Sequence, residues 1–195
     1  MTRDEEKRII ASVIAGDTQS FELLVLEHQS KVYNLALKMV GNEQDALDIS
    51  QDAFIKAFRS LDSFRGDSKF SVWLYRLTSN LCLDHLRAKK RNNVVSLTMY
   101  SSEEEEPEEM EIPDERYAPE KLLDKKELQQ NLSSALEQLP PEQKEILLLR
   151  EVSGLSYEEI AQSLGLEPGT VKSRIFRARK NICKILLKSG NFSPL

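Results

Sequence analysis

Residues 156–180 read SYEEIAQSLGLEPGTVKSRIFRARK, and this stretch predicts two helices joined by a tight turn. Ser156 and Glu159 have the spacing of a capping box, which satisfies free backbone N–H groups at the start of a helix. Gly165 permits the left-handed conformation that ends the first helix. Pro168 suits the first turn of the second helix, because its missing N–H group costs nothing there. The two helices are therefore expected at residues 156–164 and 168–188.

The second of these helices is amphipathic, and its outer face is basic. Residues 168–188 contain seven Lys or Arg residues and no acidic residue. A short helix, a glycine turn and a second helix with a basic face are typical of a helix-turn-helix, which inserts its second helix into the major groove of DNA. An ordinary helical hairpin with a solvated basic face is the alternative. The residues expected on the buried sides are Ile160, Ala161, Leu164, Val171, Ile175, Ala178 and Ile182.

The composition bounds the class of protein. The chain of 195 residues has room for one large domain or two small ones, and its hydrophobic content of 40% is sufficient for folded cores. No apolar run approaches the length of a membrane span, and the first residues do not resemble a signal peptide. Two cysteines, Cys82 and Cys183, lie far apart in the sequence and suggest no disulfide framework. We therefore expect a protein of the reducing cytoplasm.

Acidic charge is concentrated in one segment. The net charge is −5, but residues 101–116 hold nine acidic residues and one basic residue, which leaves the rest of the chain at +3. Residues 92–119, which include this segment, contain three prolines and few aliphatic residues, so they are too charged to fold alone. We predict a flexible acidic linker at residues 92–119. As a hypothesis, its charge keeps the free protein from binding DNA, so that replacing its glutamates by glutamine raises DNA affinity.

Apolar residues recur at helical spacing along most of the chain, and few positions favour strand. We therefore predict an all-α fold with two small helical domains joined by the linker, the C-terminal one a helix-turn-helix. The expected domains cover residues 1–91 and 120–190. The expected helices cover residues 3–15, 18–40, 43–60, 69–90, 120–138, 141–151, 156–164 and 168–188.

An acidic helix face is predicted in the N-terminal domain. Asp45, Asp48 and Asp52 are spaced at i, i+3 and i+7, so they lie along one side of the helix, whereas Ile49 and Ala53 suit the other side. An acidic face of this kind is usually only solvated. The residues alone therefore leave open whether it docks a partner.

Aromatic and basic residues alternate in the segment that follows. Three aromatic residues fall within residues 70–75, in the first turns of a helix that follows a glycine loop. Aromatic side chains interleaved with Arg and Asn suit single-stranded nucleic acid, where stacking contributes about 1–3 kcal/mol per base. For Trp73 itself, packing in a small core is the more common role. The polar residues that can share one face of this helix are Arg76, Asn80 and Arg87.

Cys82 and His85 have the spacing of a pair of metal ligands. Only His28 and Cys183 could complete a four-ligand site of cysteine and histidine, and both are remote in the sequence. Packing of Cys82 within a helix is the simpler interpretation. We therefore expect no metal and no cofactor.

With these residues in view, the chain resembles the extracytoplasmic-function sigma factors, the small two-domain group of the sigma-70 family. The resemblance runs from about residue 16 to residue 182 and fails only in the linker. Departures are few: Leu47 and Ser50 stand where relatives often carry a Glu and an aliphatic residue, and Asp52 replaces a common Glu. The most specific pieces are QDAFIKAF (51–58), LDSFRGDS (61–68), WLYR (73–76), GLSYEEIA (154–161) and PGTVKSRIFRAR (168–179).

The resemblance implies an all-α promoter-specificity subunit of bacterial RNA polymerase, without catalytic activity of its own, that serves a stress- or signal-responsive set of promoters. It implies that the C-terminal domain binds the distal (−35) promoter element as duplex, through Arg150, Tyr157, Thr170, Lys172, Ser173, Phe176 and Arg177. It implies that the N-terminal domain captures melted start-proximal (−10) DNA, where relatives flip a base, through Phe64, Arg65, Arg76, Asn80 and Arg87. It also implies docking on the clamp helices of the polymerase large subunit through Asp48, Gln51 and Asp52.

Control by a partner is a further implication of the resemblance. The family leads us to expect an anti-sigma factor, often membrane-bound, which would hold the chain at the inner face of the membrane. No residue of the chain identifies that partner.

A stand-alone helix-turn-helix repressor or activator is the alternative function. It would explain residues 120–188 but leave residues 48–91 without a role, and the chain shows no heptads for dimerisation. Gel filtration discriminates between the two: a 1:1 complex with core polymerase favours the sigma factor, and a homodimer on a palindrome favours the regulator.

Overall fold

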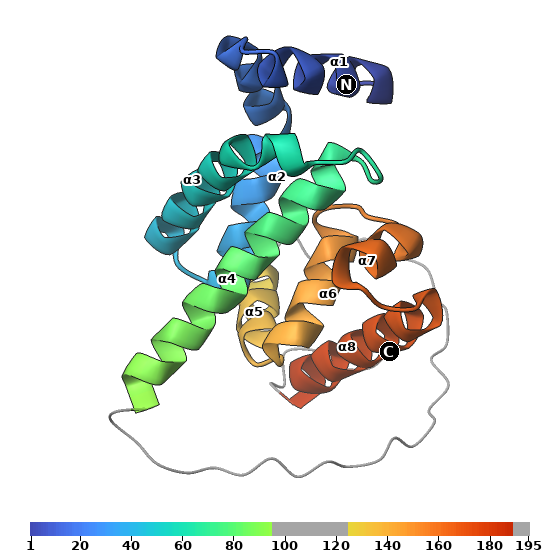
Figure 1. Ribbon diagram of the computed structural model, residues 1–195. Coiled ribbons are helices and arrows are strands. Elements are labelled where there is room, and N and C mark those ends of the chain that lie inside the picture. The colour runs from blue at the N-terminus through green and yellow to red at the C-terminus, as the bar shows by residue number, and fades with distance from the viewer. Residues whose placement is uncertain (95–124, 189–195) are drawn as a thin grey trace.

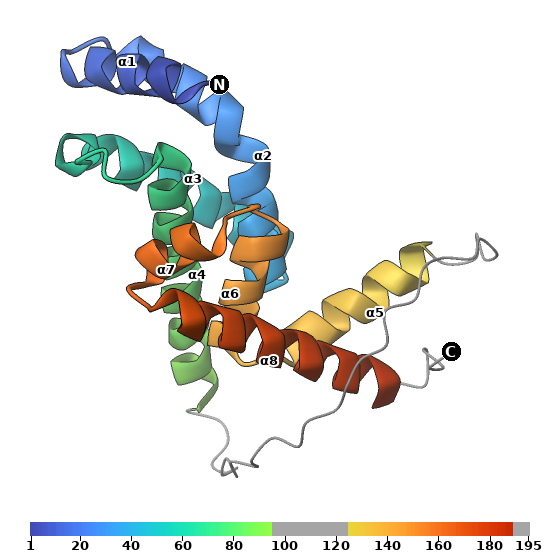
Figure 2. The ribbon, with the colours of Figure 1, turned by 90° about the vertical axis from the view of Figure 1, so that its right-hand side faces the viewer.

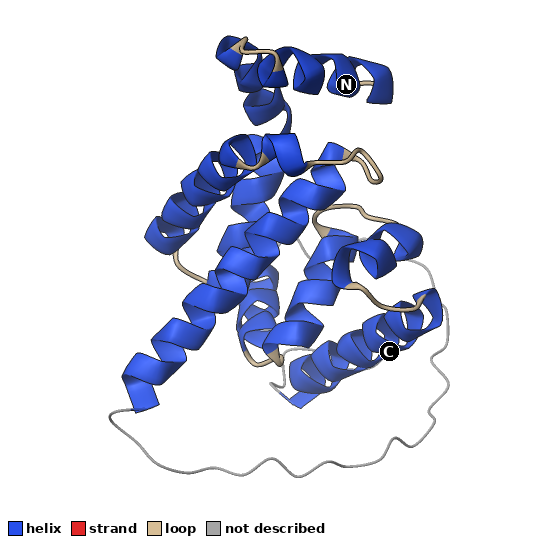
Figure 3. Ribbon diagram, viewed as in Figure 1, coloured by secondary structure: helices blue, strands red, loops and turns tan. Residues whose placement is uncertain are grey.

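The computed structural model of the protein describes residues 1–94 and 125–188, and every regular element in these ranges is a helix (Figures 1 and 3). This confirms the predicted all-α fold. The linker predicted at 92–119 falls mostly outside the described residues. No helix within the two ranges combines the length and apolar character that a membrane span requires. The elements are α1 (Arg3–Ile14), η1 (Thr18–Ser20), α2 (Phe21–Val40), α3 (Glu43–Arg59), η2 (Leu61–Ser63), α4 (Phe70–Val94), α5 (Lys125–Glu137), α6 (Pro141–Glu151), α7 (Tyr157–Leu164) and α8 (Pro168–Lys188).

Helices α2, α3 and α4 form an N-terminal module. They pack against one another in all three pairings, and Leu35, Ala53 and Leu74, one from each helix, are fully buried at their centre. Helix α1 lies across one end of α2 (Figure 1). An ion pair of 3.3 Å between the amino group of Met1 and the Glu27 carboxylate fixes its start to α2.

Within residues 1–94, two helix boundaries differ from those expected by more than one residue. The helix predicted at 18–40 is divided, because η1 forms a single 3₁₀ turn and α2 begins only at Phe21. The Asp17 carboxylate holds this turn by accepting a hydrogen bond from the Ser20 N–H (3.4 Å). At the other end of the module, α4 continues to Val94, three residues past the expected domain boundary. No Gly or Pro interrupts the sequence there.

The first turn of α4 is capped by a side chain from α1. Glu6 Oε1 accepts a hydrogen bond of 2.9 Å from the Phe70 N–H. The first N–H groups of a helix have no partners within it, and a carboxylate there also interacts favourably with the positive end of the helix dipole. The two residues are 64 positions apart, so local sequence patterns give no sign of the contact. Helix α1 therefore helps to position the loop that precedes α4.

Helices α7 and α8 form the predicted helix-turn-helix. The Ser156 hydroxyl accepts a hydrogen bond from the Glu159 N–H (3.1 Å), and the Glu159 carboxylate accepts one from the Ser156 N–H (2.8 Å). Gly165 has a φ of 67°, which is the predicted left-handed cap, and α8 begins at Pro168. The predicted stripes are confirmed: Ile160, Ala161, Val171, Ile175 and Ala178 are buried, and Leu164 and Ile182 are half-buried.

The N-terminal module and the C-terminal module (α5–α8) pack against each other. Helix α6 lies against α2 and α4, and α7 lies against α4 (Figures 1 and 2). The buried apolar residues of both modules form one continuous core. On α6, Lys144 and Glu145 are only 5% and 6% exposed. Burial lowers the pKa of the Lys144 ammonium and raises the pKa of the Glu145 carboxyl. The sequence predicts two domains but does not predict this contact between them.

Glu6→Ala removes the carboxylate that caps α4. We expect the variant to lose about 1 kcal/mol of unfolding free energy, a typical cost for removing a helix cap, as measured by urea denaturation followed by circular dichroism. Glu6→Gln is the matched control, because its side-chain carbonyl can still accept the bond from the Phe70 N–H. Equal losses in the two variants would contradict the capping role.

Candidate nucleic-acid and partner interfaces

The outer face of α8 carries the residues predicted to read duplex DNA. Lys172 and Arg177 are exposed, and the Phe176 ring is 56% exposed. Thr170 and Ser173 are half-buried at the start of the helix, where the Ser173 hydroxyl donates a hydrogen bond to the Thr170 carbonyl (2.9 Å). All five therefore lie in the N-terminal part of α8, which is the part that enters the groove in a helix-turn-helix.

Arg150 and Tyr157, predicted to lie near backbone phosphates, brace the entrance to α7. The Arg150 guanidinium donates a hydrogen bond to the Leu155 carbonyl (2.8 Å), and its Cζ lies 5.2 Å from the centroid of the Tyr157 ring. Both side chains are half-buried. A guanidinium has five N–H groups, so a bond to the turn leaves others for a phosphate. The structural role of Arg150 is one that the sequence did not indicate.

The basic residues of α8 are not equivalent. Arg179 forms an ion pair of 2.6 Å with Glu151 and thereby ties α8 to α6. Arg174 is exposed near the start of α8, beside the predicted contacts, although it was not among them. The only sequence feature that pointed to Arg174 was its place in a run of basic residues. Lys184 is exposed farther along the helix, beyond the part expected to enter the groove.

Three aromatic rings gather where the loop of residues 64–69 meets α4. The Phe64 centroid lies 5.2 Å from that of Trp73 and 6.0 Å from that of Phe70, and the last two lie 5.7 Å apart. Phe70 is fully buried, whereas Phe64 and Trp73 are half-buried. Trp73 thus packs against the core and still keeps part of its surface accessible.

The polar residues predicted to meet single-stranded DNA lie on the same side of the module. Arg76, Asn80 and Arg87 are exposed, and their spacings of four and seven residues place them on one face of α4. Arg65 is exposed in the preceding loop, next to Gly66, whose φ of 73° lies in the left-handed region that a glycine tolerates.

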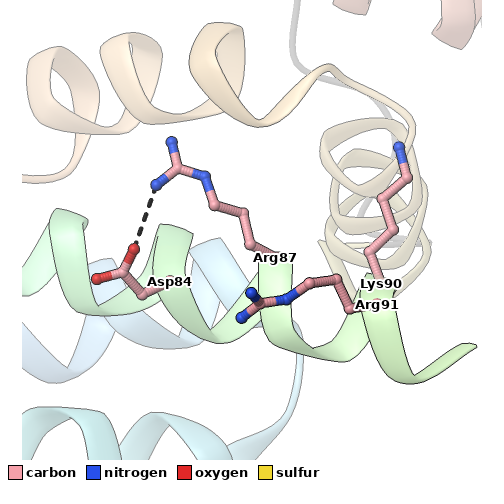
Figure 4. A pocket seen from close by; sticks show the side chains of 4 residues that line it. All are labelled: Asp84, Arg87, Lys90 and Arg91. Carbon is pink, nitrogen blue, oxygen red and sulfur yellow. Dashed lines mark hydrogen bonds and ion pairs between the residues drawn. The ribbon is translucent and has the colours of Figure 1, made fainter.

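A basic cavity surrounds the far end of this face. It measures about 620 Å³ and is lined by Asp84, Arg87, Lys90 and Arg91 (Figure 4). Arg87 pairs with Asp84 at 3.2 Å. Among the described lining residues, three cations surround one carboxylate and leave this lining net positive, which suits an anion such as a backbone phosphate.

The predicted docking face on α3 is exposed and combines acidic with apolar side chains. Asp48, Gln51 and Asp52 are all exposed. Leu47 and Ile55 flank them at 46% and 48% exposure, and their spacing from Gln51 places them on the same side of the helix. Exposed aliphatic residues grouped on one face are typical of partner surfaces. Sequence reasoning named Leu47 only as a departure from the family pattern and missed Ile55.

Asp45, which the sequence placed on the same face, is turned toward α4. Its carboxylate lies 3.2 Å from His85 Nε2 and 3.8 Å from Lys89 Nζ. Asp45 therefore joins α3 to α4 rather than extending the docking face. Cys82, three residues before His85, is buried, and burial raises the pKa of its thiol to about 12. Among the described residues, no group of three or more His, Cys, Asp or Glu side chains could hold a metal ion.

Both modules match known protein families. A family model described as "Sigma-70 region 2" matches residues 24–92, and one described as "Sigma-70, region 4" matches residues 129–182. The RNA polymerase sigma-H factor of Pseudomonas aeruginosa is 39% identical over 186 residues, which cover 95% of this chain and 96% of the relative. The ECF RNA polymerase sigma-E factor of Escherichia coli (strain K12) is 42% identical over 174 residues, which cover 89% of this chain and 90% of the relative.

Two solved structures resemble this chain in fold over most of its length. The sigma factor RpoE from Bartonella quintana, in a co-crystal with the anti-sigma factor NepR, superposes with a TM-score of 0.64 at 27% identity, over 86% of this chain and 97% of that one. CnrH, in complex with the cytosolic domain of CnrY, has a TM-score of 0.66 at 24% identity, over 93% of this chain and 96% of that one. This second likeness shows a common fold.

Arg150→Ala removes both the hydrogen bond to Leu155 and the contact with the Tyr157 ring. We expect the unfolding free energy to fall by about 2 kcal/mol, since a charged hydrogen bond contributes about 1.5–3 kcal/mol and a cation–π contact about 0.5–1 kcal/mol. Arg150→Lys should recover little of this loss, because an ammonium cannot reproduce the planar fork. Urea denaturation measures both variants, and a Lys variant as stable as the parent chain would contradict the bracing role.

Proposed function

This chain belongs to the sigma-70 family, in its extracytoplasmic-function group, and from that premise we propose that three exposed faces each carry one step of promoter recognition. The chain is a promoter-specificity subunit of RNA polymerase, so the proposal concerns which residues perform each step. The observation that carries it is that the predicted residues lie exposed or half-buried on three separate surfaces: α8 with the turn between α6 and α7, α4 with the loop before it, and α3. In this proposal the chain works only by binding DNA and polymerase and catalyses no reaction itself.

The C-terminal module anchors the distal element as duplex DNA. Contacts to phosphates supply affinity and a few contacts to base edges supply choice. Lys172, Phe176 and Arg177 extend from the exposed face of α8 toward the groove, with Thr170 and Ser173 at the start of the helix. Arg150 and Tyr157 stand at the entrance to α7, where a phosphate can use the remaining guanidinium N–H groups of Arg150.

The N-terminal module captures the start-proximal element once its strands part. Opening costs about 1.4 kcal/mol of stacking per step, and a trapped base recovers part of this by stacking and hydrogen bonding. The half-buried rings of Phe64 and Trp73 offer a stacking surface. The Asn80 amide can both donate to and accept from a base. Arg65, Arg76 and Arg87 are exposed, and their guanidinium groups would bind the phosphates of the strand.

The face of α3 docks the chain on core polymerase. Asp48, Gln51 and Asp52 would meet basic and polar groups on the clamp helices of the large subunit. Leu47 and Ile55 add apolar area at the two ends of the same face. Apolar area gives affinity, whereas charge gives orientation and association rate. The whole face therefore suits a specific complex better than the carboxylates would by themselves.

An anti-sigma factor controls the chain, which works in the cytoplasm. The support comes from the solved relative RpoE, which is bound to its anti-sigma factor NepR. An anti-sigma factor anchored in the membrane would hold the chain at the inner face of that membrane. A stand-alone regulator, the alternative function, finds no support, because the family match covers residues 24–92 as well as the helix-turn-helix.

Run-off transcription with purified core polymerase on genomic fragments tests the function as a whole. We expect discrete transcripts that require the chain, together with a 1:1 complex on gel filtration. A chain that neither binds core polymerase nor alters initiation on any fragment would overturn the proposed function.

Lys172→Ala and Arg177→Ala test the duplex contacts. We expect each to weaken binding of promoter duplex by about tenfold and to reduce the slope of log affinity against log salt by about one for each lost phosphate contact. Binding is measured for the holoenzyme by fluorescence anisotropy at several salt concentrations. Lys184→Ala is the matched control, because Lys184 is exposed on the same helix beyond the expected contact. An equal loss in the control would show that only general charge matters.

Asn80→Ala tests strand capture. We expect it to reduce open-complex formation while duplex anchoring stays nearly unchanged, because Asn80 is exposed on the N-terminal module, away from α8. Permanganate footprinting measures strand opening, and anisotropy on the same template measures anchoring. Normal opening in the variant would remove this assignment.

A further inference from the structure

We propose that the His28 imidazole makes the aromatic cluster at the start of α4 sensitive to pH. The cluster consists of the rings of Phe64, Phe70 and Trp73. It stays ordered while His28 is neutral and loosens when His28 takes up a proton. The inference rests on the proposed role of Phe64 and Trp73 as the stacking surface for the start-proximal strand, and it goes beyond that role by making strand capture depend on pH.

His28 lies inside the N-terminal module, against the first turns of α4. Its side chain is only 7% exposed. The centroid of its ring lies 5.7 Å from that of Phe70 and 6.1 Å from that of Tyr75. Phe70 in turn contacts the rings of both Phe64 and Trp73. Because protein interiors are close-packed, a displacement of His28 is passed to the cluster through the Phe70 ring.

The surroundings of the His28 ring do not compensate for a positive charge. Its Nε2 atom is buried and has no hydrogen-bond partner among the described residues. An imidazolium donates from both ring nitrogens, so its Nε2–H group would be buried without an acceptor. The attraction of the two neighbouring aromatic rings for a cation is weaker than the cost of burying that charge. Protonation therefore favours an arrangement in which His28 reaches water.

A cavity of about 340 Å³ lies beside His28 and brings both signs of charge around it. Its cations are the Met1 amino group, Arg3, Lys31 and Lys69, and its carboxylates are those of Glu6, Glu27 and Glu159. Each carboxylate already has a partner: Glu6 accepts the hydrogen bond of the Phe70 N–H (2.9 Å), Glu27 pairs with the Met1 amino group (3.3 Å) and Glu159 pairs with Lys69 (2.9 Å). All three are thus engaged before His28 is protonated.

The other groups around the cavity add no counter-charge. Tyr75 is neutral, since burial raises the pKa of its phenol to about 12. Among the described residues that line the cavity, helices α3 and α6 contribute no titratable side chain. Burial accordingly lowers the pKa of the His28 imidazole, which Glu27 opposes and which Lys31 and the Met1 amino group reinforce.

The direction of the pH dependence follows from this lowered pKa. A His28 ring that has reached water regains the ordinary histidine pKa of about 6.5, so the loosened form binds a proton more readily than the packed form. The packed form keeps its full stability above a pH of about 6.5 and loses it as the pH falls through its own, lower pKa. Acidification therefore loosens the aromatic cluster, and a return to neutral pH restores it.

Trp73 makes this loosening measurable in the intact chain, because it is the only tryptophan. Between about pH 7.5 and about pH 5.5, we expect its emission to shift to longer wavelength and its quenching by acrylamide to increase. His28→Gln cannot ionise and should show neither change. His85→Gln is the matched control, because it removes the only other histidine, which pairs with Asp45 of α3. Equal acid responses in the parent chain and in His28→Gln would overturn the proposal.

Proton NMR of the histidine rings tests the parent chain directly, even if His28→Gln does not fold. The spectrum of His85→Gln identifies the His28 resonance, since the chain has two histidines. We expect the His28 ring to titrate below the ordinary pKa of about 6.5, with the same midpoint as the Trp73 emission. A His28 ring that titrates at or above that value would contradict the proposal.

A DNA arm distinguishes this inference from the role on which it rests. Permanganate footprinting of the holoenzyme at both pH values gives the ratio of strand opening in His28→Gln to that in the parent chain, so that the pH dependence of polymerase itself cancels. We expect this ratio to rise at acidic pH, by at most about tenfold for each unit by which packing lowers the pKa of His28.

The two possible failures are separate. If Trp73 responds to pH through His28 but the ratio of strand opening stays constant, the pH-sensitive cluster stands and its role in strand capture fails. If the ratio rises while the emission of Trp73 is the same in both chains, the pH-sensitive cluster fails.

Discussion

Helix α4 faces three different environments at once, the N-terminal core, helix α6 and solvent, and the rest of the structure depends on this constraint. One side, with Phe70 and Leu74, completes the core with α2 and α3. A second side, with Ser79 and Cys82, is buried beside α6. The third side, with Asn80, stays in solvent. A helix of 25 residues can separate these three stripes along its length because its period of 3.6 residues returns each stripe every few positions. The core side, the interface side and the exposed side with Asn80 thus belong to one helix.

The features that could be predicted from the sequence are those whose causes lie within a few residues. The capping box at Ser156, the left-handed Gly165 and the start of α8 at Pro168 each depend on neighbours no more than four positions away. The exposed faces with Asp48 and Lys172 follow from helical period alone, since a buried stripe fixes the opposite face. Sequence and structure therefore agree on the helix-turn-helix and on the exposed sides of α3 and α8 that carry Asp48 and Lys172.

The contacts that could not be predicted join residues far apart in the chain. Glu6 caps α4 from a distance of 64 residues, and Gln162 reaches the Asp67 carbonyl across 95 residues. Asp45 fits the acidic stripe by its spacing, but it lies at the edge of that stripe and contacts His85 of α4 instead. Lys144 and Glu145 oppose the general rule that charged residues stay exposed. Only the tertiary arrangement explains their burial, so no local pattern could reveal them.

Because the two modules belong to one chain, an interface between them needs less free energy to form than one between two separate proteins. Two separate proteins would have to offset about 4–15 kcal/mol of lost translational and rotational freedom to associate. Modules of one chain meet at an effective concentration on the order of millimolar, so an interface containing two buried charges can still close.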